Sequence, residues 1–203
     1  MRRHKPEWAE RGIRHFRALD ADPFPLMVLT PADASDPQYS AAVAGADWVY
    51  FSGGDPGYAV ATLEGTPFWN AVLARHQAGA ILAGSSAGAM MLGEQTFVPI
   101  DRDQETGLPL DVKVTRALGV VPGAFVFPHF DVIPRHVFEK WQGLWPSGLR
   151  LLALDEDTAI VSGAEGWTVH GAGRALVMRD PSDQRAFVDQ MTIDARVLPL
   201  IRQ

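Results

Sequence analysis

The chain contains no cysteine, and this absence has wide consequences. Without thiols there can be no disulfides, no thiolate metal sites and no cysteine nucleophile. If the protein is a hydrolase that works through a covalent intermediate, a serine or threonine must therefore be the nucleophile.

Other features are also scarce. The formal net charge is −6 and there is no block of basic residues, so the composition predicts no nucleic-acid partner. No apolar run is long enough to cross a bilayer, which predicts no membrane partner. The charged N-terminal residues lack the apolar core of a secretory signal, which favours a cytoplasmic protein. A length of 203 residues with 47% hydrophobic content predicts a single domain, 1–203, with a sizeable core.

The most informative segment is residues 81–91, Ile-Leu-Ala-Gly-Ser-Ser-Ala-Gly-Ala-Met-Met. An apolar strand runs into a Gly-x-Ser-x-Gly pattern centred on Ser86, and helix-forming residues follow. In such a turn the small neighbours let the chain reverse sharply and lift the central serine out of the backbone. The first amides of the following helix then point at the site and can stabilise an oxyanion.

The first half of the chain alternates between helix and strand patterns. The expected elements are a helix over 7–19, a buried strand over 24–30, a short helix within 36–45, a strand over 47–52, a helix within 59–78 that is entered or broken near Pro67, and a strand over 80–84. This order predicts an α/β fold with a mostly parallel sheet covered by helices on both faces. Ligands of such sheets gather at the carboxyl ends of the strands, where Gly53-Gly54 and Ser86 both fall.

The second half is less regular. The patterns indicate a surface loop or hairpin over 97–116, an apolar segment leading into His129, a helix over 135–145, a strand–turn–strand over 151–161, a hairpin over 167–178 and at most a short strand in 185–203. We find no repeat, low-complexity tract or linker.

Three histidines are candidates for the base that a serine nucleophile needs. His129 follows an apolar strand, at the kind of position where catalytic groups of α/β folds gather. His136 falls in the first turn of a predicted helix, and His170 lies in an alternating stretch. No His-x-x-x-His or His-Glu-x-x-His spacing predicts a metal site.

The acid that orients the base is expected in the turn Asp155-Glu156-Asp157, which ends another apolar strand. Two triads can be drawn. One is Ser86, His129 and Glu156. The other is Ser86 with Asp155 or Asp157 and His170, in the Ser…Asp/Glu…His order of α/β-hydrolases. We favour the first, because the acid and base of the second would lie on adjacent strands of one hairpin.

Together these residues resemble the family of serine peptidases that contains aspartyl dipeptidase (peptidase E) and cyanophycinase. The resemblance runs from about residue 25 to about residue 178. It rests on four segments: Tyr50-Phe51-Ser52-Gly53-Gly54-Asp55, Ala83-Gly84-Ser85-Ser86-Ala87-Gly88-Ala89, Leu118-Gly119-Val120-Val121-Pro122-Gly123 with Pro128-His129-Phe130, and Leu154-Asp155-Glu156-Asp157-Thr158-Ala159.

The resemblance implies a flavodoxin-like fold, like that of the class I glutamine amidotransferases, and hydrolysis of short peptides through an acyl-enzyme. It implies Ser86 as nucleophile, His129 as general base and Glu156 as the group that orients the base. The backbone amides of Gly54 and Ala87 would form the oxyanion hole, and Asp55 lies in the same family motif. It implies no metal, no other cofactor and a homodimer.

Two departures bear on the substrate. Pro56 stands where the family often has glutamine. Arg135 stands alone where cyanophycinases carry a run of arginines, and it is the candidate to pair with a carboxylate of an acidic peptide. The chain also looks as if it lacks the family's first strand. Two alternatives remain at this point: an esterase-like hydrolase that uses His170, and a catalytically inactive binding protein on the same scaffold.

Overall fold

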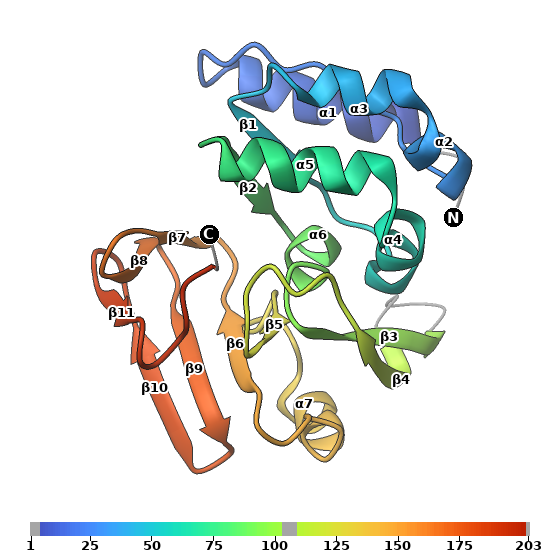
Figure 1. Ribbon diagram of the computed structural model, residues 1–203. Coiled ribbons are helices and arrows are strands. Elements are labelled where there is room, and N and C mark those ends of the chain that lie inside the picture. The colour runs from blue at the N-terminus through green and yellow to red at the C-terminus, as the bar shows by residue number, and fades with distance from the viewer. Residues whose placement is uncertain (1–4, 103–108, 202–203) are drawn as a thin grey trace.

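A computed structural model describes residues 5–102 and 109–201 and shows a mixed α/β fold (Figure 1). The helices are α1 (Lys5–Arg17), α2 (Pro31–Ser35), α3 (Pro37–Val43), α4 (Pro56–Leu63), α5 (Pro67–Gln77), α6 (Ala87–Met90) and α7 (Arg135–Gln142). The strands are β1 (Trp48–Phe51), β2 (Ile81–Gly84), β3 (Gln95–Arg102), β4 (Pro109–Arg116), β5 (Ala124–Phe127), β6 (Arg150–Leu154), β7 (Thr158–Ser162), β8 (Gly166–Gly171), β9 (Ala175–Asp180), β10 (Asp183–Phe187) and β11 (Thr192–Asp194).

Helices α2 to α5 all begin in the same way. Each starts with a proline, whose fixed φ suits the first helical turn. The residue before that proline is a threonine or aspartate whose side chain accepts a hydrogen bond from an amide of the first turn. These N-cap residues are Thr30, Asp36, Asp55 and Thr66. The same signal explains why the helical stretch expected over 59–78 is two helices, with α5 entered at Pro67.

The strands form three sheets. Strands β1 and β2 pair in parallel, and a larger sheet has the order β10-β9-β6-β5-β3-β4. At the centre of this larger sheet β3, β5 and β6 run parallel, while β4, β9 and β10 are added antiparallel at its two sides. Strands β11, β8 and β7 form a small antiparallel sheet near the carboxyl end of β6 (Figure 1).

Two hydrophobic cores lie on the two faces of the larger sheet. Side chains alternate between faces along a strand, so neighbouring residues of β5 enter different cores. Val126 faces the core that contains residues of α4 and α5, whereas Phe125 and Phe127 face the core that contains Trp141 of α7. Every residue of β5 is buried, as expected for a strand covered on both faces.

Three predictions of elements were wrong. Residues 24–30 are not a strand, because Pro25 lacks an amide donor and Leu29 bonds to side chains instead: its amide donates to Asp33 and its carbonyl accepts from Tyr58. The strand–turn–strand predicted over 151–161 is present as β6 and β7, whereas the hairpin predicted over 167–178 is absent. In each segment the second strand lies in a different sheet from the first, so β6 pairs with β9 and β7 pairs with β8.

The last prediction to fail concerned residues 185–203, which contain parts of β10 and β11 rather than at most one short strand. The hairpin expected over 97–116 is present as β3 and β4, although its connection, 103–108, is outside the described residues.

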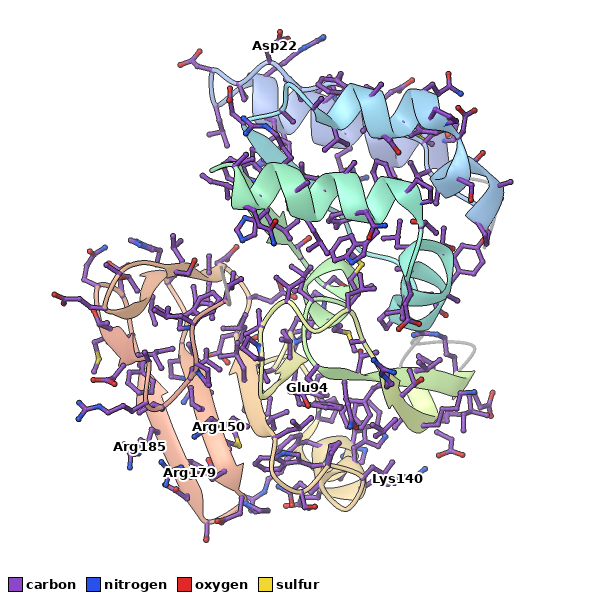
Figure 2. All side chains as sticks on the ribbon, in the orientation of Figure 1. Asp22, Glu94, Lys140, Arg150, Arg179 and Arg185 are labelled. Atoms are coloured by element: carbon purple, nitrogen blue, oxygen red, sulfur yellow. The ribbon has the colours of Figure 1, made fainter. Side chains whose placement is uncertain are left out.

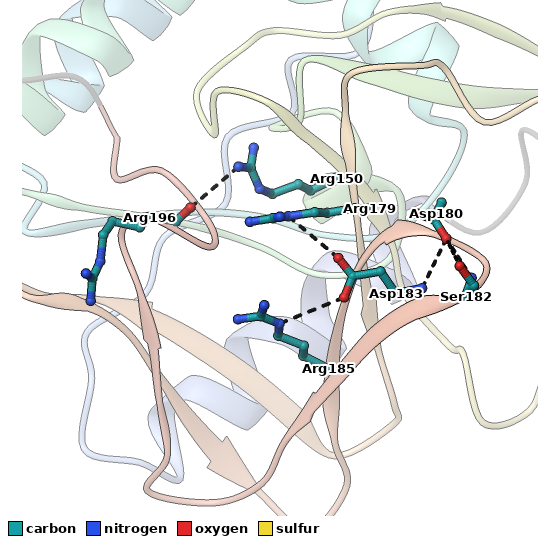
Figure 3. Close-up of polar contacts among 7 residues, drawn as sticks. All are labelled: Arg150, Arg179, Asp180, Ser182, Asp183, Arg185 and Arg196. Atoms are coloured by element: carbon teal, nitrogen blue, oxygen red, sulfur yellow. Dashed lines mark hydrogen bonds and ion pairs between the residues drawn. The ribbon is translucent and has the colours of Figure 1, made fainter.

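Arginines gather at the amino-terminal end of β6 and on the neighbouring hairpin of β9 and β10 (Figure 2). Asp183 bridges Arg179 and Arg185 there, at 3.8 and 3.9 Å (Figure 3). Arg150 begins β6, whereas Glu156 follows the end of that strand. This cluster therefore lies at the opposite end of β6 from the predicted acid.

Candidate active site

Ser86 sits on a sharp turn between β2 and α6. Its backbone has φ 52° and ψ −123°, a combination that costs energy for a residue with a side chain. The turn is held on both sides: the amide of Ser85 donates to Phe51 O at 3.1 Å, and the amide of Met90 donates to Ser86 O at 3.0 Å. The expected elbow is present, and the helix after it is a single turn.

Glycines make this turn sterically feasible. A Cβ on Gly84 would lie 2.3 Å from Gly88 O, and a Cβ on Gly88 would lie 2.1 Å from Phe51 O. Neither position can hold a side chain without moving backbone. Gly53 packs directly against the serine, since a Cβ there would lie 3.3 Å from Ser86 Oγ. The two glycine-rich strand ends are therefore in contact, as their sequence positions predict.

His129 approaches Ser86 from the end of β5. Its backbone also lies in the left-handed region, with φ 61°, which is uncommon for a residue with a side chain. Its Nε2 lies 2.9 Å from Ser86 Oγ, a normal hydrogen-bond distance. The ring is half-buried, so it can exchange protons with the serine and with a substrate group on the solvent side.

Glu156 is the third member of this hydrogen-bonded chain. Its Oε1 lies 2.5 Å from His129 Nδ1, the ring nitrogen that faces away from the serine. A carboxylate at this position holds the tautomer in which Nδ1 carries the proton and leaves Nε2 free to accept one. The three residues come from the ends of β2, β5 and β6.

The carboxylates on either side of Glu156, those of Asp155 and Asp157, do not face His129 in the same way. Asp155 points inward and is almost fully buried, and its Oδ2 accepts hydrogen bonds from Arg174 Nε at 2.9 Å and from the Arg174 amide at 3.1 Å. Asp157 is exposed and has φ 51°. Of the three adjacent acids, only Glu156 bonds to His129 among the described residues.

Two backbone amides near the serine lack a protein acceptor among the described residues. Within the described chain, the amides of Gly54 and Ala87 donate to no protein acceptor. Gly54 follows Gly53, which touches the serine, and Ala87 follows Ser86 directly. Free amide donors close to a nucleophile are the kind of group that can stabilise the negative charge that develops on a carbonyl oxygen.

The other predicted site residues have structural partners. The Asp55 side chain accepts from the Tyr58 amide at 2.9 Å and so caps α4, with Pro56 as the first helical residue. Arg135 lies on α7 with its side chain 90% exposed, and its Nε donates to Glu139 at 2.7 Å. The His170 ring lies 3.5 Å from the amide nitrogen of Gln190. The structure does not bring His170 to the serine, whose hydroxyl contacts His129.

The arrangement has the geometry of a Ser-His-acid triad with a neighbouring pair of amide donors. Within residues 5–102 and 109–201, no group of three His, Asp or Glu side chains is placed to hold a metal ion. None of the helices in these ranges is long and apolar enough to cross a membrane.

Comparison with known proteins decides the family. The model of peptidase family S51 matches residues 4–169, which is most of the chain. The chain belongs to peptidase family S51. As a member of S51 it is a serine-type peptidase.

Solved structures agree with this assignment. The chain is similar to the crystal structure of a peptidase from an acI-B1 actinobacterium, with 31% identity and a TM-score of 0.76 over 93% of this chain and 76% of that one. It is also similar in fold to a peptidase E-like protein from Listeria monocytogenes, with 18% identity and a TM-score of 0.60 over 80% of this chain and 77% of that one. The S51 chain thus has the flavodoxin-like fold of these neighbours.

Sequence reasoning missed two residues around the acid turn. Asp131 bonds to the amide of Glu156, and Arg174 pairs with Asp155. The one local signal for Asp131 is that its polar side chain stands two residues after the predicted base, which does not identify its partner. No local pattern pointed to Arg174, because its partner lies 19 residues away.

Proposed function

We propose that the protein hydrolyses peptide bonds of short peptides, with Ser86 as nucleophile, His129 as general base and Glu156 as the group that orients the base. The observation that carries this proposal is the unbroken hydrogen-bonded line from Ser86 Oγ to His129 Nε2 at 2.9 Å and from His129 Nδ1 to Glu156 at 2.5 Å.

The first half of the reaction forms an acyl-enzyme. His129 Nε2 takes the hydroxyl proton as Ser86 Oγ attacks the scissile carbonyl carbon. The carbonyl oxygen becomes an oxyanion, and the amides of Gly54 and Ala87 donate hydrogen bonds to it. The intermediate collapses by breaking the C–N bond, and the proton passes from Nε2 to the departing amine.

The second half restores the enzyme. Water attacks the ester carbon and gives a proton to His129 Nε2. The second tetrahedral intermediate then expels Ser86 Oγ, which recovers that proton, and the carboxylic acid product leaves. Throughout, Glu156 accepts the hydrogen bond from Nδ1–H and stabilises the imidazolium that forms twice in each cycle.

Replacing Ser86 with alanine tests the proposal. We expect Ser86→Ala to lower kcat on a dipeptide panel by about 10³-fold or more, because the covalent route is lost. Ser85→Ala is the matched control. It removes a hydroxyl one residue away that bonds to Tyr50 rather than to His129, so activity should remain within a few-fold.

A fluorophosphonate probe adds a readout that needs no known substrate. Intact-mass analysis should show one adduct on the wild type and on Ser85→Ala, and none on Ser86→Ala. Full activity of Ser86→Ala would refute the nucleophile. Absence of any adduct on a well-folded wild type would instead favour an inactive binding protein on this scaffold.

We propose further that the enzyme is an exopeptidase or dipeptidase that prefers acidic residues. Arg135 is the candidate partner for the substrate carboxylate, and it would have to exchange Glu139 for that carboxylate. Digestion of a peptide library, read by mass spectrometry, would report both the end attacked and the residue preferred.

We also propose that residues 1–203 act as a single catalytic domain, located in the cytoplasm and paired as a homodimer. The described chain itself contains nucleophile, base and acid, which supports one complete site per subunit. Light scattering coupled to size exclusion would measure the oligomeric state.

A further inference from the structure

The acid of the triad is attached to the loop that carries the base by two successive hydrogen bonds. Strands β5 and β6 are parallel neighbours, with Phe127 opposite Ala153. Beyond the strand ends the Phe130 amide donates to Leu154 O at 3.0 Å. The next bond is made by a side chain: the Glu156 amide donates to Asp131 Oδ1 at 2.8 Å.

This second bond is made by the backbone of Glu156 itself, whose carbonyl accepts from Thr158 Oγ1 at 3.0 Å within the same turn. The Glu156 side chain is 49% exposed, and its carboxylate has His129 as its protein partner among the described residues. A glutamate side chain that is free to rotate loses rotamer entropy when it is fixed in one geometry. Anchoring its backbone in advance reduces the freedom that the contact with His129 must overcome.

The residues on either side of Glu156, Asp155 and Asp157, are held by a different part of the chain. Asp155 is bound by Arg174, and the Ala172 amide donates to Asp157 O at 3.0 Å. Both partners belong to the connection between β8 and β9, which carries no part of the triad. Besides the Glu156–His129 contact itself, the Asp131 side chain links the turn to the loop that bears His129.

We infer that Asp131 is a positioning residue: by accepting the Glu156 amide proton it sets the distance between the Glu156 carboxylate and His129 Nδ1. This inference deepens the proposed function and relies on the triad named there. The acceptor oxygen carries the role, and the negative charge of Asp131 is not required for it.

The test compares Asp131→Ala, which removes the acceptor, with Asp131→Asn, which keeps an acceptor oxygen and removes the charge. Asp157→Asn is the matched control, because it removes an adjacent charge at a position with φ 51° that asparagine tolerates. We expect Asp131→Ala to lower kcat about 10- to 100-fold with little change in KM. Asp131→Asn should recover most of that loss, and Asp157→Asn should remain near wild type.

A spectroscopic readout separates this inference from the proposed function. A proton on His129 Nδ1 that is hydrogen-bonded to Glu156 gives a far-downfield ¹H NMR resonance, which Glu156→Gln should shift upfield. Asp131→Ala should shift or broaden that resonance, and Asp131→Asn should retain it, whether or not the protein cleaves any peptide. Thermal unfolding confirms that each variant is folded.

Each outcome has one meaning. Wild-type kinetics and resonance in Asp131→Ala would overturn the inference, and so would equal losses in the alanine and asparagine variants, which would assign the effect to charge. A protein without peptidase activity whose downfield resonance still depends on the Asp131 acceptor would refute the proposed function and leave the positioning role intact.

Discussion

At the scale of the residue, the choice between His129 and His170 decides which triad operates. His129→Gln should reduce kcat by about 10³-fold or more, because the proton of Ser86 then has no acceptor. His170→Gln should leave kcat within a few-fold of wild type, because its ring contacts Gln190 and not the serine. Steady-state kinetics on one peptide would check both variants. A selective loss in His170→Gln would reinstate the esterase-like alternative.

At the scale of the element, the packing of α6 against β1 depends on the absence of one side chain. Gly88→Ala would place a Cβ 2.1 Å from Phe51 O, and that oxygen is held by the amide of Ser85. We expect a loss of about 1–3 kcal/mol or more in the free energy of unfolding, since backbone must move to accept the methyl group.

Gly12→Ala provides the control for that substitution. Gly12 lies within α1, and a Cβ there meets nothing within 4 Å. The free energy of unfolding of Gly12→Ala should therefore be about 0.5–1 kcal/mol higher than that of the wild type, the usual difference between alanine and glycine inside a helix. Urea unfolding measures both changes, and equal stabilities of the two variants would show that the turn after β2 is not close-packed.

At the scale of the whole molecule, stability should fall in acid partly through two carboxylates. Hydrogen bonds from the Ser182 hydroxyl and amide hold the pKa of Asp180 below its ordinary value of 3.8 (Figure 3). Hydrogen bonds from the Arg196 side chain and amide lower the pKa of Asp194 much further. Because both pKa values are lower in the folded state, their contribution is present above about pH 4 and is lost as the pH falls through the folded values.

Unfolding in urea across pH 7 to 2 would measure this loss. In Ser182→Ala the largest cause of the Asp180 shift is removed, so the free energy of unfolding should decline less steeply below about pH 4. Identical pH dependence in wild type and variant would show that this turn does not contribute. The contribution of Asp194 to the pH dependence should be the same in both proteins, because its partner Arg196 is unchanged.

Features encoded by neighbouring residues are predictable from the sequence, whereas features that depend on distant residues are not. Local patterns predicted the strands that bear the triad, because a buried strand such as 81–84 and the turn after it are encoded by adjacent residues. Strand partners were not predictable in the same way. Short apolar runs indicate that 150–154 and 158–162 are strands, but they carry no information about which sheet each strand joins.

The same distinction between local and long-range interactions applies to the candidate active site. Ser86, His129 and Glu156 could be proposed because each stands at the end of an apolar strand and within a family motif. The bond from Asp131 to Glu156 could not be proposed, since it joins residues 25 positions apart through a loop conformation that no periodicity records.

The serine and the imidazole are supported by different sheets. Ser86 follows β2, in the two-stranded sheet, whereas His129 and Glu156 follow strands of the larger one. One contact of 2.9 Å therefore spans the seam between two separately hydrogen-bonded frameworks. Proton transfer along that contact depends steeply on its length. Turnover therefore depends on how accurately the two sheets are held relative to each other. Side chains packed between the two sheets can influence the chemistry in this way without contacting the substrate.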